Sequence, residues 1–113
     1  MAQETHDALI GIAQHDPNVL ENILRARSEN QEASGLDSRT YALVNIAALI
    51  AIDAAPASYV WQVGLALEAG VTAEEILALL VALNPVVGSA KIVAAAPELA
   101  LAIGVDLDAL TGS

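Results

Sequence analysis

Apolar residues recur at helical spacing in a series of segments that proline and glycine separate. In residues 4–14 they stand at positions i, i+1, i+4 and i+5, which gives a helix one apolar face. Asp16 and Pro17 then have the residue types of an N-cap and a first helical position, because proline has no N–H group to leave unbonded there. These two segments predict a helical hairpin at the start of the chain.

The next segment changes from polar to strongly apolar. Residues 28–35 lack an apolar period and are predicted to be a solvated loop that ends at Gly35. Asp37 or Ser38 then caps a helix whose stretch from Tyr41 to Ala54 is apolar nearly all round. This helix is therefore expected to be the central and most buried element.

The middle of the chain contains signals for the start and the end of helices. Pro56 starts a helix that ends before Gly70, the residue type favoured in a left-handed conformation just past a helix end. Thr72 and Glu75 then form a capping box, in which each side chain accepts a hydrogen bond from the backbone N–H of the other residue. The spacing predicts a new helix from residue 73.

The last third contains two more prolines that predict helix starts. Asn84-Pro85 repeats the pattern of a cap and a first helical residue, and Pro97 starts a short helix that Gly104 ends. No segment alternates with the period of a strand. The predicted fold is all-α, a compact bundle of about six to seven helices. One domain is expected, with the helical hairpin and loop in residues 1–35, a core in 36–103 and a tail in 104–113.

The composition adds expectations about partners. Hydrophobic residues make up 56% of the 113-residue chain, more apolar surface than one small subunit can cover, so self-association through a helical face is expected. A net charge of −10 with four basic residues disfavours nucleic acid and anionic membranes. Polar residues interrupt the long apolar run in residues 76–96, and the first residues do not resemble an export signal. We therefore expect no membrane span, and we expect a cytoplasmic location.

The chain has no cysteine, which excludes disulfides, thiolate catalysis and cysteine-ligated metals. His6 and His15 lack the spacing and the carboxylate neighbours of a metal site. There is no phosphate-binding glycine loop and no nucleophile elbow. We therefore expect neither a metal nor a cofactor.

Three stretches carry a family resemblance. They are L-D-S-R-T-Y-A-L-V-N-I-A, S-Y-V-W-Q-V-G-L-A-L-E-A-G-V-T-A-E-E-I and N-P-V-V-G-S-A-K. Together they resemble the carboxymuconolactone decarboxylase family, which includes the alkyl hydroperoxidase D-like proteins, over about residues 36–103. The resemblance implies an all-α fold and assembly as a trimer or hexamer, in agreement with the excess of apolar residues.

The reactive groups of that family are replaced in this chain. The redox branch uses Cys-x-x-Cys-x-x-x-His, and counting back from Gly70 puts the two cysteine positions on Ala55 and Ser58 and the histidine position on Gln62. The associated glutamate position falls near Ala42 or Leu43, so it is missing as well. Cysteine peroxidase activity is excluded, because a serine hydroxyl is far too weakly acidic to replace a thiolate. An amide at the histidine position cannot shuttle a proton near neutral pH.

The remaining candidate residues surround Gln62. Ser58 and Gln62 are one helical turn apart with Trp61 beside them, so together they could line an apolar pocket for a small apolar or aromatic molecule. Asp53, if buried, would have a raised pKa suited to proton transfer. The structural alternatives are that Ser58 packs or caps, Trp61 fills a core or interface and Gln62 bonds a neighbouring chain. For Asp53 they are a solvated helix end or a bond to the amides at the start of the next helix.

Three functions stay open at this point. The first is a ligand-binding oligomer of this family without thiol redox chemistry. The second is a divergent decarboxylase or lactone-processing lyase, with Asp53 as proton carrier and Gln62 orienting the substrate. The third is a structural oligomer with no ligand. Replacing Asp53 by Asn separates the first two wherever turnover is found.

Overall fold

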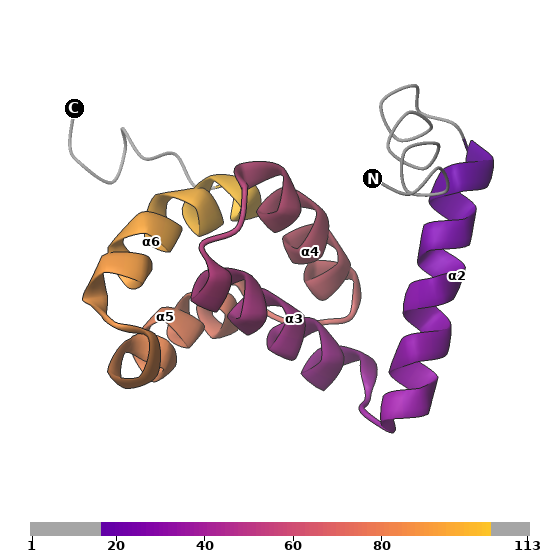
Figure 1. The fold of residues 1–113 in the computed structure, drawn as a ribbon, viewed down its shortest axis with the longest axis horizontal. Helices are drawn as coiled ribbons and strands as arrows, with labels where there is room; N and C mark the ends of the chain where they lie inside the picture. The colour runs from indigo at the N-terminus through magenta and orange to yellow at the C-terminus, as the bar shows by residue number, and fades with distance from the viewer. Residues whose placement is uncertain (1–16, 105–113) are drawn as a thin grey trace. The chain divides into compact units, whose positions relative to one another are not determined.

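The computed structural model describes residues 17–104, and these form five helices joined by short turns (Figure 1). The helices are α2 (Pro17–Ser34), α3 (Ser38–Ile52), α4 (Pro56–Glu68), α5 (Ala73–Val87) and α6 (Ser89–Ile103). Residues 17–104 contain no strand, so the all-α prediction is confirmed for them. The helix predicted over residues 4–14 and the tail beyond Gly104 lie outside the described residues.

The chain divides into two compact units, one ending at Leu36 and one starting at Asp37. In the first unit, α2 continues to Ser34, so the predicted loop over residues 28–35 is wrong. That stretch holds good helix formers such as Glu, Gln and Ala, and no proline or glycine before Gly35. Gly35 has a φ of +74°, which ends the helix. No residue of α2 is buried.

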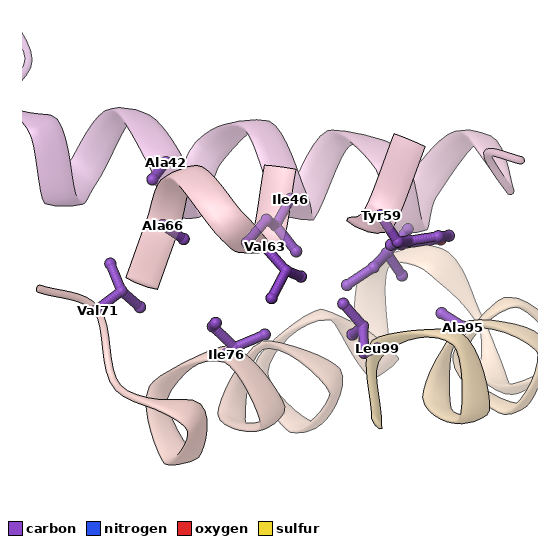
Figure 2. Packing of buried hydrophobic residues seen from close by; sticks show 10 residues of the cluster. Ala42, Ile46, Tyr59, Val63, Ala66, Val71, Ile76, Ala95 and Leu99 are labelled. Atoms are coloured by element: carbon purple, nitrogen blue, oxygen red, sulfur yellow. The ribbon is translucent and has the colours of Figure 1, made fainter. Parts of the chain in front are cut away.

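The second unit is a four-helix arrangement in which α6 contacts α3, α4 and α5, and α3 contacts both α4 and α5. Apolar side chains from all four helices meet in one cluster (Figure 2). Its buried members are Ala42, Ile46, Ile50, Tyr59, Val63, Ala66, Val71, Ile76, Ala95 and Leu99. Helix α3 supplies more buried residues than any other described helix, as predicted. It is not buried all round, because Val44 is 51% exposed and Ile52 is 71% exposed.

The two helix starts predicted at prolines in the last third are wrong. Helix α5 runs through Pro85 and α6 runs through Pro97, and the only break between them is at Gly88. Gly88 has φ +89° and ψ +151°, a backbone conformation that residues with a Cβ rarely adopt, so it interrupts the helix. Both prolines are exposed, where water can replace the hydrogen bond that each removes.

None of the helices described in residues 17–104 is by itself both long enough and apolar enough to cross a membrane. The helices α2 and α3 meet the criteria of length and composition only when they are taken together across the break between them.

Candidate functional site

Helix α4 carries three of the four candidate residues. Pro56 occupies its first turn as predicted, and its N-cap is Ala55, which has no side-chain capping bond. The backbone N–H of Ser58 donates to the Ala55 carbonyl at 3.0 Å, as in an ordinary first helical turn. Ser58 is therefore inside the helix and is not its cap.

The candidate residues of α4 lie along one edge of the helix. Ser58 and Gln62, one turn apart, are both half-buried. Trp61 is next to them on the outer side and is 38% exposed. The adjacent face is buried in the cluster through Tyr59 and Val63. The structure thus brings an indole, a hydroxyl and an amide together at the border between core and surface.

Asp53 ends α3 rather than continuing it. Its backbone is left-handed, with φ +55° and ψ +57°, and its N–H donates to the Ile50 carbonyl at 3.3 Å. It is the only residue other than glycine with positive φ in residues 17–104. Its side chain is exposed in the single chain, so the burial that would favour proton transfer is not present there.

Tyr59 is a polar residue of this region that the sequence interpretation missed. It is 1% exposed, and its hydroxyl donates to the Leu49 carbonyl at 3.2 Å. Burial, and then the negative charges of Asp53 and Glu98, raise the pKa of Tyr59, so it stays a neutral donor. Its position four residues before buried Val63 is the signal that could have placed it in the core. Tyr59 therefore ties α4 to the end of α3.

Lys91 provides a second tie at the same end of α3. Its ammonium group, from the first turn of α6, donates to the Ala51 carbonyl at 2.6 Å. The last carbonyls of a helix have no partner within it and carry the negative end of the helix dipole, so a cation is favourable there. This bond joins the start of α6 to the end of α3.

The predicted capping box is present at the start of α5. The Glu75 N–H donates to the Thr72 hydroxyl at 3.1 Å, and the Thr72 N–H donates to a Glu75 carboxylate oxygen at 3.0 Å. Arg39 of α3 also donates to both oxygens of this carboxylate. The bond from Arg39 and then the bond from Thr72 lower the pKa of Glu75 to about 2. Glu75 is therefore an ionised structural group that joins α3 to α5.

No group of three or more His, Asp or Glu residues in the described part of the chain could hold a metal ion. His6 and His15 lie outside the described residues.

Three comparisons with known proteins bear on the family of this chain. A search of curated proteins and a search of solved structures each found none. The model of the carboxymuconolactone decarboxylase family matches residues 17–101, which span α2 to most of α6 and extend the resemblance on its N-terminal side. Because this match covers well over half of the chain, the protein belongs to the carboxymuconolactone decarboxylase family.

Proposed function

We propose that this chain is a non-redox member of the carboxymuconolactone decarboxylase family that binds a small apolar or aromatic molecule against Ser58, Trp61 and Gln62. It acts as a homo-oligomer, with a trimer or hexamer as the size that the family resemblance implies. The absence of cysteine from the sequence supports the non-redox part, since peroxide reduction in the redox branch needs a thiolate.

The exposure of Trp61 is the observation that supports the ligand most directly. Trp61 is 38% exposed, so part of its indole is open to contact, and Ser58 and Gln62 on the same helix are half-buried. Binding sites for small molecules commonly combine apolar contact area with a few polar groups that fix orientation. An indole face with a hydroxyl and an amide nearby therefore suits a flat, weakly polar molecule.

Trp61 also supplies the experiment, because it is the one tryptophan of the chain and its fluorescence reports on this edge of α4. We would titrate the protein with phenol, benzoate and γ-butyrolactone. A saturable fluorescence change is expected with one of them. Gln62→Ala should weaken that binding about fivefold, the equivalent of one hydrogen bond of about 1 kcal/mol.

Val60→Ala is the matched control, because Val60 is on the same helix and 62% exposed but carries no polar group. It should leave the affinity unchanged. No saturable change with any of the three probes at millimolar concentration would overturn the proposal and favour the structural oligomer.

A divergent lyase is the second candidate, in which Asp53 carries a proton and Gln62 orients a lactone or acid. The left-handed backbone of Asp53 favours it, since strained positions of residues other than glycine cluster at active sites. Asp53→Asn tests it cleanly, because asparagine also tolerates this conformation. Loss of turnover by about 100-fold or more is expected for a proton carrier. Unchanged turnover would rule out this role of Asp53.

A further inference from the structure

Helix α5 is apolar on its outer side as well as on its inner side. Ile76 is fully buried in the core cluster. On the other side, five exposed residues form what we name the α5 outer stripe: Ala78, Val81, Ala82, Pro85 and Val86. The two valines are 79% and 82% exposed, the highest values among the large exposed apolar residues described. A helix that is apolar all round is normally covered on every side.

The spacing of the α5 outer stripe is that of a helix-packing face. Its members stand at i, i+3, i+4, i+7 and i+8, the pattern that a helix normally turns toward a core. Ala78 and Ala82 are one turn apart and leave room for a facing helix to come close, while Val81 and Val86 form ridges beside them. The geometry suits another helix better than a loop or a flat surface.

We infer that a second copy of this chain packs on the α5 outer stripe. This inference rests on the proposed homo-oligomer and names the face that forms it. Charge is the reason for this choice of occupant. The chain carries a net charge of −10, so two copies repel each other wherever their carboxylates meet. Residues 76–90 contain no charged side chain, so copies can approach there without that repulsion.

Other occupants fit this face less well. A nucleic acid or an anionic lipid needs a cluster of basic residues. In the second unit Arg39 is bonded to Glu75, and Lys91 is bonded to the Ala51 carbonyl. Helix α5 has 15 residues, whereas a membrane span needs about 20. A basic partner protein would find no carboxylate along the stripe itself.

The exposed face of α4 is the competing surface, since Val60 and Leu67 there are 62% and 41% exposed. That face ends at the charged Glu68, and Trp61, the residue against which the ligand is proposed to bind, directly follows Val60. The α5 outer stripe has no polar side chain among its five members. The two faces therefore have different expected roles, and matched variants can separate them.

The test is light scattering coupled to size exclusion at micromolar concentration, on the wild type, Val81→Glu, Val86→Glu and the control Val60→Glu. The wild type and Val60→Glu should elute as the same multiple of the 11.6 kDa chain. Each α5 variant should weaken assembly about 10-fold or more, because a charge placed in an apolar interface loses its water. All three positions are more than 60% exposed, so the variants should keep the wild-type far-UV helical signal.

The experiment distinguishes failure of the proposed homo-oligomer from failure of the proposed interface. A monomeric wild type would overturn both the proposed homo-oligomer and this interface. If neither α5 substitution weakens assembly, the protein is still an oligomer but the α5 outer stripe is not its interface. The same conclusion follows if Val60→Glu weakens assembly as much as the α5 substitutions do. Sedimentation of the wild type with phosphatidylcholine vesicles, lost in Val81→Glu, would replace the second copy by a lipid surface.

A second measurement uses the absence of native cysteine. In Val81→Cys the single thiol should react with a maleimide more slowly as the protein concentration rises, because assembly covers it. The matched Val60→Cys thiol should react at the same rate at every concentration. Equal behaviour of the two thiols would reject the assignment.

Discussion

Helix α2 and the unit built from α3 to α6 are both helical, but they are stabilised in different ways. Helix α2 has 18 residues, buries none of them and carries charged residues from Glu21 to Glu32, including the exposed pair Glu21 and Arg25. The α3–α6 unit has few charges and draws its buried cluster from all four helices. Local interactions therefore support α2, whereas the second unit depends on contacts between helices.

The largest expected effect comes from the shared core. Leu99 is fully buried and lies in the cluster that joins α6 to the other helices. Leu99→Ala should lower the free energy of unfolding by about 3 kcal/mol, because it removes buried methyl groups and leaves a cavity. Urea denaturation followed by circular dichroism measures this. The control is Leu101→Ala, because Leu101 is on the same helix and is 57% exposed. If Leu101→Ala lowered the free energy of unfolding by as much, the comparison would be contradicted.

The contact between α3 and α5 should make the second unit sensitive to acid. The folded pKa of Glu75 is about 2, below its usual 4.5, so its ionised form favours folding. That contribution is fully present above about pH 4.5 and is lost as the pH falls toward 2. The melting temperature of the wild type should therefore fall over this range, and that of Glu75→Gln should fall less.

The control for this acid sensitivity is Glu74→Gln, since Glu74 is exposed in the same helical turn. It should keep the wild-type pH profile. A Glu75→Gln profile as steep as that of the wild type would show that the bonds from Arg39 and Thr72 do not couple folding to pH.

A smaller effect is expected at the end of α3. Asp53 holds a left-handed backbone that glycine adopts without a steric penalty. Asp53→Gly should raise the free energy of unfolding by about 0.5 kcal/mol, and Asp53→Ala should lower it by about 1 kcal/mol. Urea denaturation of both variants tests this. The opposite order would mean that the aspartate side chain contributes more than the backbone costs.

The smallest effect is expected in α2. The Arg25 guanidinium lies 3.6 Å from the Glu21 carboxylate, with both side chains at least 60% exposed. Such pairs are screened by water and salt, so Arg25→Ala should change the free energy of unfolding by about 0.5 kcal/mol or less. A loss above about 1 kcal/mol would show that α2 depends on more than local interactions.

The sequence interpretation was most accurate for interactions between residues that are close together in the chain. Signals formed within one helical turn were confirmed, as in the Asp37 cap, whose side chain accepts from the Thr40 N–H at 2.7 Å, and in the box of Thr72 and Glu75. The proline rule failed at Pro85 and Pro97. Packing of the inner faces of α5 and α6 continues past both prolines and outweighs a lost hydrogen bond on the exposed side.

In the candidate site, too, local features could be predicted from the sequence and contacts between distant residues could not. The helical period alone placed Ser58 and Gln62 on one edge of α4, and this is what the structure shows. The partners of Tyr59 and Lys91 are carbonyls that lie 10 and 40 residues away in the chain. No local pattern specifies such a backbone acceptor, because it becomes accessible only where a helix ends beside another element.

By itself the sequence determined that this protein is helical, that it lacks thiol chemistry, and where the capped helices start, because these properties depend on composition and on neighbours a few residues apart. Only the tertiary structure decided that Glu75 joins two helices through Arg39, that Asp53 ends α3 in a left-handed turn, and that α5 keeps an apolar outer face. These depend on how the helices pack, because packing decides which side of each helix is covered and which polar groups meet.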